Sequence, residues 1–317
     1  MTAAVRPATR RVDDLGTIVA IVNETRPEWS TSVAELRWED LTYPGATRFI
    51  AEVEGVGVGV ATVGRIWVQS PDYDALWAAI DVLEPFRCRG IGGALLAAVR
   101  EVAASLEKAH LHVPATDSRP EAVTFFLHRE FAEFERMRVW RLDLAALTPP
   151  VVECPAGVEL TTLEARPDLL PSIHRVALDA FGDIPGGDEP MAVGDLAEFR
   201  ARDVERPGIP PDGFTIAVEV ATGEAIGYAS MIFSGAATTV AHHDMTAVQR
   251  SWRGRGVATA LKRRTIAWAV ERGVGALETS NDEANVGMQR INERLGFRPR
   301  PDELVLRGSV AEAIIRP

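Results

Sequence analysis

The chain has 317 residues, of which 46% are hydrophobic and 25% are charged. This composition is typical of a globular protein and excludes a disordered or collagen-like chain, and at roughly 100 to 200 residues per domain the length predicts two domains. The formal net charge of −11 would repel a phosphate backbone, so we expect no nucleic-acid partner and favour a neutral or cationic small substrate.

Two further features of the composition indicate where the protein works. The opening residues, MTAAVRPATRRVDDLG, carry no apolar signal core, and no stretch approaches the roughly 18 apolar residues of a membrane span. Cys88 and Cys154 are the two cysteines of the chain, too few for a disulfide framework. We therefore predict a cytoplasmic protein without a membrane partner. Of the 34 basic residues only Lys108 and Lys262 are lysine, a bias that we attribute to a GC-rich bacterial genome.

The first half of the chain predicts an opening strand at VRPAT, helices, strands, a glycine-rich loop, a helix, a strand, a further helix and a closing strand. Hydrophobic runs bounded by turn residues indicate the strands, and apolar residues at helical spacing indicate the helices. In chain order the predicted elements are RFIAEVE, VGVGVATVG, LWAAIDV, the helix from Gly90 to about Lys108, AHLHVP, the helix around Ala122 to Arg129, and WRLDL.

A segment rich in proline follows that closing strand. LTPPVVECPAG holds three prolines and a glycine, a composition typical of a domain boundary. We therefore predict one module at residues 1–148, a linker at 149–157, and a second module at 158–317.

The second half shows the same order of elements. FTIAVEV and AIGYASMIF are separated by the hairpin signal ATGE, and ATTVAHHDMTAV is expected as a third strand that runs into a glycine-rich loop. The helix after the loop places Val257, Leu261, Ile266 and Ala269 on roughly one face, with Lys262, Arg263 and Arg264 beside them. The strand ALETSN and a helix around MQRINERL, which Gly296 ends, complete the pattern.

The two halves are also related residue by residue. VLEPFRCRGIGGALLAAVREVA, from Val82, aligns with VQRSWRGRGVATALKRRTIAWA, from Val248. Val82 and Val248 are 166 positions apart, and the same offset relates Arg87 to Arg253 and Gly90 to Gly256. A constant offset of this kind predicts a tandem duplication.

Each repeat contains a glycine loop suited to an anion. Glycine lets the backbone approach a phosphate closely, and the start of a helix offers unpaired N–H groups and the positive end of the helix dipole. A Walker loop is excluded because no Gly-Lys-Ser/Thr follows, and the dinucleotide fingerprint needs an early strand, whereas these loops lie past the middle of each half. The loops therefore predict binding of a different pyrophosphate-containing nucleotide.

These motifs resemble those of a known family. VxxxxRGRGVATAL at Val248 to Leu261 and TSNDEANVGMQRINERLGF at Thr279 to Phe297 are similar to the acetyl-CoA motif and closing segment of the GCN5-related N-acetyltransferases, and two such modules resemble the tandem members of that family. The resemblance implies an α/β (α+β) fold of two modules, each with a mixed, mostly antiparallel sheet that splays beside the loop, and acetyl-CoA as the cofactor. The positions that it assigns to the cofactor are Val248, Arg253, Gly254, Arg255, Gly256, Val257, Ala258, Thr259 and Asn285 in the second half, and Val82, Arg87, Arg89, Gly90, Ile91, Gly92 and Gly93 in the first.

The halves depart from the family at the position of a frequent tyrosine, whose hydroxyl can protonate the departing thiolate. That position is Asn292 in the second half and Phe126 in the first, and Arg119 stands in the first half where Asn285 stands in the second. Because the first half departs further, with Glu130 in place of a glycine, the resemblance implies that the second half is catalytic.

Acetyl transfer to an amine needs a base and a donor that polarises the thioester carbonyl. We expect the donor to be a backbone N–H of the strand that ends at Val248. Asp244 and His243 are the candidate bases on this strand; alternation would place Asp244, Thr246 and Val248 on one face and His243 on the other. A solvent-exposed strand start without catalytic residues is the competing interpretation. We predict no metal site, because adjacent strand residues diverge and no further ligand lies nearby.

The acceptor is expected beside the loops that differ most between the halves. Carboxylates there could anchor a cationic amine, although a solvated acidic loop explains them equally well. Tyr228 could supply a hydroxyl or belong to the core. The acidic and aromatic candidates are Asp179, Asp183, Asp188 and Glu189 in the second half, and Glu24, Glu28 and Trp29 in the first.

The resulting prediction is an acyltransferase that moves acetyl from acetyl-CoA directly to a primary amine of a small molecule, a metabolite or an antibiotic. Two alternatives remain open: a non-catalytic acyl-CoA sensor or scaffold, and a family member that acetylates a cysteinyl pseudodisaccharide in thiol biosynthesis. We expect either a monomer, in which the two modules form an internal pseudo-dimer, or a homodimer.

Overall fold

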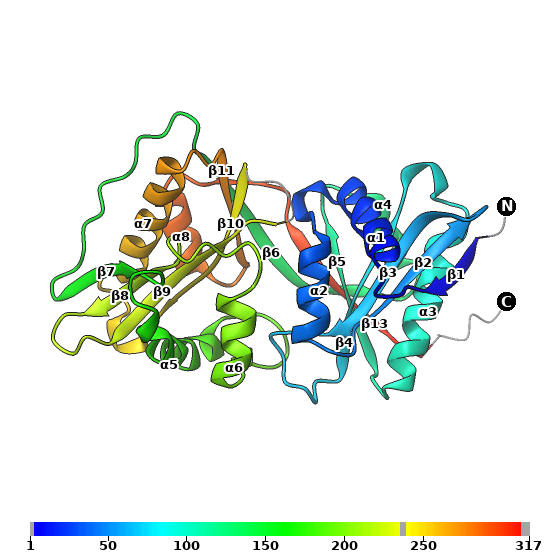
Figure 1. The fold of residues 1–317 in the computed structure, drawn as a ribbon, viewed down its shortest axis with the longest axis horizontal. Helices are drawn as coiled ribbons and strands as arrows, with labels where there is room; N and C mark the ends of the chain where they lie inside the picture. The colour runs from blue at the N-terminus through cyan, green and yellow to red at the C-terminus, as the bar shows by residue number, and fades with distance from the viewer. Residues whose placement is uncertain (1–2, 235–238, 312–317) are drawn as a thin grey trace. The chain divides into compact units, whose positions relative to one another are not determined.

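The computed structural model describes residues 3–234 and 239–311 (Figure 1). It contains two compact units: unit 1 comprises Met1–Arg136 and Asp302–Pro317, and unit 2 comprises Met137–Pro301. The units are not the two sequence halves, because strand β6 (Ala132–Asp143) runs from unit 1 into unit 2 and strand β13 (Glu303–Ser309) belongs to unit 1. The segment expected as a linker, 149–157, connects two strands of unit 2.

Unit 1 is a mixed sheet with helices on both faces. Its strands follow the order β1-β2-β3-β4-β5-β13, and β4 and β5 are parallel whereas the other neighbours are antiparallel. Its other elements are β1 (Ala4–Pro7), α1 (Val12–Thr25), η1 (Pro27–Trp29), α2 (Val33–Thr42), β2 (Thr47–Val53), β3 (Val56–Arg65), β4 (Ala75–Val82), η2 (Glu84–Phe86), α3 (Ile91–Ser105), β5 (His110–Thr116) and α4 (Pro120–Leu127).

Unit 2 repeats this arrangement in the order β6-β11-β10-β9-β8-β7, with β10 and β11 parallel and β12 also paired with β6. Its other elements are β7 (Val158–Thr162), η3 (Pro167–Leu169), α5 (Leu170–Ala180), η4 (Phe181–Asp183), α6 (Leu196–Phe199), η5 (Arg200–Val204), β8 (Thr215–Glu219), β9 (Ala225–Ile232), β10 (Val240–Val248), η6 (Arg250–Trp252), α7 (Val257–Glu271), β11 (Ala276–Asp282), α8 (Val286–Arg294) and β12 (Arg298–Pro299).

Each sheet is buried on both faces. In unit 1, α1 and α2 pack on one face through Leu15, Ile18 and Leu36, and α3 and α4 pack on the other. In unit 2, α5 and α6 cover one face, and α7 covers the other beside β8, β9 and β10 (Figure 1). Burial on both faces explains why the central strands are almost continuously apolar in sequence.

The structure confirms the duplication. The bounds of α7 and β11 are those of α3 and β5 moved by 166 positions. Gly59 in β3 and Gly227 in β9 occupy matching environments: a Cβ atom there would lie 3.1 Å from the carbonyl oxygen of Asp81 and 2.9 Å from that of Ala247, respectively. Glycine at both positions therefore lets each sheet pack closely beneath the helix that follows its loop.

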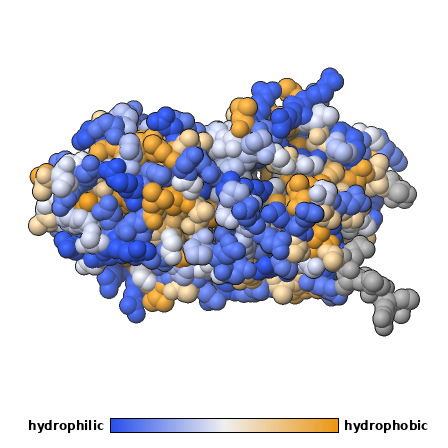
Figure 2. Space-filling view, turned by 90° about the horizontal axis from the view of Figure 1, so that it is seen from below, coloured by the Kyte–Doolittle hydropathy of each residue, from blue (hydrophilic) through white to orange (hydrophobic). Residues whose placement is uncertain are grey.

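No helix within residues 3–234 and 239–311 combines the length and the apolar character needed to cross a membrane. On the face drawn in Figure 2, apolar residues form small groups between hydrophilic ones. Exposed apolar side chains occur in both units, for example Leu41 and Val151, and scattered residues of this kind are ordinary for a protein surface.

Candidate active site

The start of helix α7 in unit 2 has the features of an anion site. Gly254 and Gly256 have φ values of 73° and 88°, which glycine adopts without steric cost. The first backbone hydrogen bond of the helix runs from Ala260 N–H to the Gly256 carbonyl, at 3.0 Å, so the N–H groups of Val257 and Ala258 have no acceptor within the helix. The first turn contains no acidic residue and no side chain caps it, which leaves these donors available to an anion.

Arginine closes this loop in both units. Arg253 Nε donates to the carbonyl of Val248 at 3.1 Å, and the equivalent Arg87 Nε donates to that of Val82 at 3.0 Å. In unit 2 Arg253 also pairs with Asp183, at 2.6 Å. Arg253 and Arg87, two of the four arginines that the resemblance assigns to the cofactor, thus hold the end of a strand against the loop.

The strands beside the loop separate. β10 and β11 are paired from Val240 to His242, and one residue further on Thr279 Oγ1 donates a 3.1 Å hydrogen bond to the His243 carbonyl. Beyond this point β10 stays paired with β9, and β11 stays paired with β6. We call this separation the fork of unit 2. One side of the fork is the end of β10, which leads directly into the α7 loop.

A β-bulge in β10 changes which residues share a face. The register shifts between His243, opposite Met231, and Thr246, opposite Ala229. Residues directly opposite one another lie on the same side of a sheet, and Met231 and Ala229 are two positions apart. His243 therefore shares a face with Thr246, the side covered by α7, and the expectation from strict alternation was wrong. β4, the equivalent strand, is paired with β3 without a register shift from Leu76 to Val82.

On the other face the bulge presents an acidic group. Asp244 is exposed, and its carboxylate lies 3.4 Å from Ser230 Oγ. The partly buried Asp203 carboxyl lies near it. Its pKa is raised to about 6, mainly by burial; the charge of Asp244 contributes to the rise, and Arg202 opposes it. Tyr228, the candidate hydroxyl, is 1% exposed and stacks on Phe214 with ring centroids 5.4 Å apart, so it belongs to the core.

On the α7 face lies a buried polar group that the sequence patterns did not indicate. Lys262 is 1% exposed, and its Nζ donates to Asn292 Oδ1 at 2.9 Å. Asn292 is fully buried and its Nδ2 donates to Asn281 Oδ1 at 3.3 Å. His243, the second candidate base, is also buried, and burial together with the charge of Lys262 holds its pKa well below the ordinary value. His243 is therefore neutral at physiological pH.

Another predicted cofactor residue of unit 2, Asn285, has a structural role. Asn285 is the N-cap of α8, and its Oδ1 accepts from Met288 N–H at 3.2 Å. Its counterpart Arg119, at the N-cap of α4, donates instead to the Thr25 carbonyl and to Glu28, the latter at 2.6 Å. Arg119 is thus a tether between α4 and the segment after α1.

Several of the acidic residues expected around an acceptor make hydrogen bonds or ion pairs within the protein. Asp179 accepts from the backbone N–H of Arg250 at 2.7 Å. Asp183 accepts from Arg250 and Arg253, whose guanidinium groups hold the pKa of its carboxyl well below the ordinary value. In unit 1, Trp29 donates to Glu303 at 2.7 Å. These contacts show that Asp179 and Asp183 brace the α7 loop.

The loop of unit 1 differs from that of unit 2 in two ways. Cys88 stands where unit 2 has Gly254 and adopts a φ of 58°. The ring of Phe125 lies against the first turn of α3, because a Cβ atom on Gly92 would be 3.2 Å from it. The guanidinium of Arg129 stacks 3.8 Å from the centre of the same ring. The space beside the helix start is therefore filled by unit 1's own side chains.

The left-handed backbone at Cys88 gives a prediction for stability. A side chain other than glycine costs about 1–2 kcal/mol in this conformation, part of which is offset by the greater freedom of glycine in the unfolded chain. We expect Cys88→Gly to raise the free energy of unfolding by about 0.5–1 kcal/mol in urea denaturation under reducing conditions. The matched change Gly254→Cys should lower it; shifts of the same sign in both variants would contradict the explanation.

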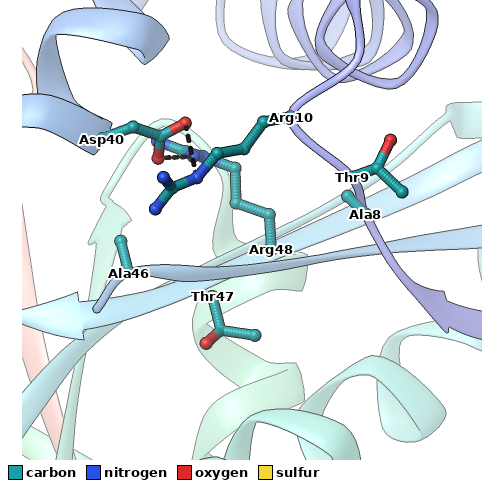
Figure 3. Close-up of a pocket in the computed structure, with 7 residues that line it drawn as sticks. All are labelled: Ala8, Thr9, Arg10, Asp40, Ala46, Thr47 and Arg48. Carbon is teal, nitrogen blue, oxygen red and sulfur yellow. Dashed lines mark hydrogen bonds and ion pairs between the residues drawn. The ribbon is translucent and has the colours of Figure 1, made fainter. Parts of the chain in front are cut away.

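A pocket of about 190 Å³ lies elsewhere in unit 1 (Figure 3). Arg48 and Arg10 both face the carboxylate of Asp40, the second at 3.6 Å. None of the predicted site residues contributes to it, so it is separate from the candidate site. Its lining residues are Ala8, Thr9, Arg10, Asp40, Ala46, Thr47 and Arg48. Within residues 3–234 and 239–311, no group of three His, Cys, Asp or Glu side chains is placed to hold a metal ion.

Comparison with known proteins agrees with this geometry. The profile of the acetyltransferase (GNAT) family matches residues 17–131 and 178–297. A mycothiol acetyltransferase of Thermobispora bispora is 28% identical over 215 residues, which cover 67% of this chain and 69% of the relative.

Two solved structures share the fold of the whole chain. A tandem GNAT protein from the clavulanic acid biosynthesis pathway has a TM-score of 0.77 at 20% identity, with 98% of this chain and 99% of that one covered. A GCN5-related N-acetyltransferase from Sphaerobacter thermophilus has a TM-score of 0.72 at 20% identity, with 98% and 97% covered. The predicted family, the two-module fold and the assignment as an acyltransferase enzyme are confirmed. With two matches of the family profile, one in each half of the sequence, the chain belongs to the GNAT acetyltransferase family and carries two of its modules.

Proposed function

We propose that unit 2 binds acetyl-CoA, with the pyrophosphate at the start of α7 and the pantetheine arm along the fork. The observation that carries this proposal is the uncapped, acid-free helix start at the end of a strand that has parted from its neighbour. Backbone N–H groups there suit a pyrophosphate, and the separated edge of β10 offers backbone groups to an amide-containing arm.

The acetyl group is transferred to a primary amine of a small molecule. The amine nitrogen attacks the thioester carbonyl, the C–S bond breaks, and the amine proton passes to a base. The acceptor amine is placed on the sheet face opposite α7, which we call the acceptor face. Asp244 is the base that fits, because it is exposed on this face at the bulge. Asn292, on the opposite face, is the polar group beside the departing thiolate. Positioning by the protein contributes a large share of the acceleration, about 7–11 kcal/mol in favourable cases.

Unit 1 is proposed to be a structural partner that holds no cofactor. Phe125 and Arg129 fill the side of α3 where a cofactor would enter, and the equivalent residues of unit 2 are the smaller Ile291 and Leu295. The contact of Arg119 with Thr25 also closes unit 1 beside the start of α4. One acetyl-CoA per chain is therefore expected.

Native mass spectrometry and a thiol-release assay test the proposal. We expect one bound acetyl-CoA per chain, and release of free CoA thiol when small primary amines are added. The same spectra report whether the protein is a monomer or a homodimer. Absence of binding would contradict the cofactor assignment, and binding without release across a broad amine panel would favour the acyl-CoA sensor.

The likeness to a mycothiol acetyltransferase favours a second, narrower candidate. In that case the acceptor is the cysteinyl amine of a pseudodisaccharide in thiol biosynthesis, and the protein works in the cytoplasm. A cysteinyl pseudodisaccharide belongs in the amine panel, and a kcat/KM for it at least 10²-fold above that for simple amines, a difference of about 2.7 kcal/mol, would select this candidate.

A further inference from the structure

Unit 2 contains a buried polar cluster where the four elements around the fork meet. It consists of His243 on β10, Lys262 on α7, Asn281 on β11 and Asn292 on α8, all less than a tenth exposed. The hydrogen bonds from Lys262 to Asn292 and from Asn292 to Asn281 join α7, α8 and β11. Lys262 also lies over the ring of Phe297, 5.3 Å from its centre. Lys262, Asn292 and Asn281 therefore form a connected network, and His243 lies close enough for the charge of Lys262 to lower its pKa.

The duplication provides an internal comparison for this cluster. At the offset of 166, Lys262, Asn281 and Asn292 correspond to Leu96, Ala115 and Phe126 of unit 1. Because of the bulge in β10, the strand registers match His243, opposite Met231, with Ala78, opposite Val63. Leu96 and Phe126 are buried in the core there. An apolar set thus satisfies the same fold, whereas burying an ammonium group carries a large desolvation cost. The fold itself does not require the polar set.

The cluster lies at the base of the fork. The backbone carbonyl of His243 accepts the hydrogen bond from Thr279, directly after the paired part of the two strands. Its side chain shares a face with Thr246, which is in the separated part of β10. Among the described residues, neither His243 Nε2 nor Thr246 Oγ1 has a hydrogen-bond partner, although both atoms are buried. Unpartnered polar atoms at this point are expected where a ligand completes the site.

The electrostatics of the cluster favour an anion. Burial lowers the pKa of Lys262 to about 7, so a substantial fraction is protonated at neutral pH. The titratable group that faces it from β10 is His243, which is neutral, while β11 and α8 contribute the amides of Asn281 and Asn292. No carboxylate is among the causes of the shift. An anion that enters the fork would therefore stabilise the ammonium form.

We propose that Lys262 is a positioning residue of acetyl transfer, which acts through Asn292. Its ammonium fixes the Asn292 amide and polarises it, so that the amide N–H becomes a stronger donor to the CoA sulfur as the C–S bond breaks and the electron pair moves to sulfur. The thiolate sulfur then takes up one proton, and the acceptor amine loses one proton to the base, so atoms and charge balance. This inference rests on the proposed function of unit 2.

The test transplants the apolar pair of unit 1 into unit 2. The double variant Lys262→Leu/Asn292→Phe should fold, with an unfolding midpoint equal to or above that of the wild type, because buried polar pairs are often replaced by apolar residues without loss of stability. It should still bind one acetyl-CoA with a similar KM, since the α7 loop is unchanged. Its kcat for thiol release should fall about 10²-fold, as after the loss of one preorganised donor.

A pH profile separates this role from a structural one. The ammonium is present below about pH 7 and is lost above it, so the ratio of wild-type to Lys262→Met kcat should fall as pH rises through about 7. Lys262→Met keeps Asn292 and provides the same readout if the double variant does not fold. Lys108→Met serves as the control. It alters the second lysine of the chain, which lies in unit 1, and should leave the profile unchanged.

Each outcome decides the proposal. A double variant that folds, binds acetyl-CoA and keeps its wild-type kcat across the pH range would overturn it and leave Lys262 a structural residue. A constant ratio for Lys262→Met would exclude the ammonium as the active form. Wild-type protein that neither binds acetyl-CoA nor releases thiol would instead remove the proposed function, and this inference with it.

Discussion

Replacing Gly256 with glutamate is expected to abolish acetyl-CoA binding to unit 2. The glutamate would carry its charge to the uncapped start of α7, where the N–H groups of Val257 and Ala258 face the proposed pyrophosphate. Losing two hydrogen bonds to a charged group, each about 1.5–3 kcal/mol, lowers affinity by more than about 10²-fold. Native mass spectrometry with acetyl-CoA should then show no bound cofactor.

Two matched variants separate the charge from the backbone. Gly256→Ala introduces the same strain at a φ of 88° without a charge, and a Cβ atom there would lie 3.8 Å from Pro155, an ordinary van der Waals contact. It should bind acetyl-CoA more weakly but detectably. Gly90→Glu makes the equivalent change in unit 1, where φ is 83°, and should leave one bound molecule per chain. Loss of binding in Gly90→Glu rather than in Gly256→Glu would assign the cofactor to unit 1.

Local patterns predicted much of the fold. In the first half the helix after the loop was expected to begin at Gly90 and begins at Ile91, although it ends at Ser105 rather than near Lys108. In the second half the helix was expected to follow the loop and begins at Val257, because glycines at positive φ mark such a turn in the sequence. The sequence did not predict that β6, from the first half, completes the sheet of unit 2, or that β13, from the second half, completes the sheet of unit 1. WRLDL reads as a strand, but its pairing with β11 of unit 2 depends on contacts with residues more than 130 positions away, which periodicity does not report.

The site was harder to predict, for two physical reasons. The bulge between His243 and Thr246 places two residues of β10, Asp244 and Met245, against one residue of β9, Ser230. Alternation holds only for an uninterrupted ladder. Lys262 was expected beside the apolar face of its helix, since lysine is seldom buried, yet it is 1% exposed. The available signal was the repeat itself, because the offset aligns Lys262 with Leu96 and Asn292 with Phe126.

Replacing Asp244 with asparagine is expected to lower kcat for thiol release by about 10² to 10⁴-fold, the contribution of a positioned general base. Asparagine keeps the size of the side chain on the exposed acceptor face but cannot take up the amine proton. Acetyl-CoA binding should be unchanged because the α7 loop is not altered. The pKa of Asp203 should fall from about 6, since the charge of Asp244 contributes to raising it. Stopped-flow thiol detection and carboxyl titration by NMR measure the two effects.

The competing base is tested by His243→Gln. His243 lies on the α7 face, away from Asp244, and is buried beside Lys262, so its loss should affect kcat less than the loss of Asp244. Glu219→Gln in β8 serves as a control for a change of charge elsewhere in unit 2. A larger loss in His243→Gln than in Asp244→Asn would move the base to the α7 face. In that case the acceptor amine enters from the side of the buried polar cluster, and the bulge orients His243 toward it.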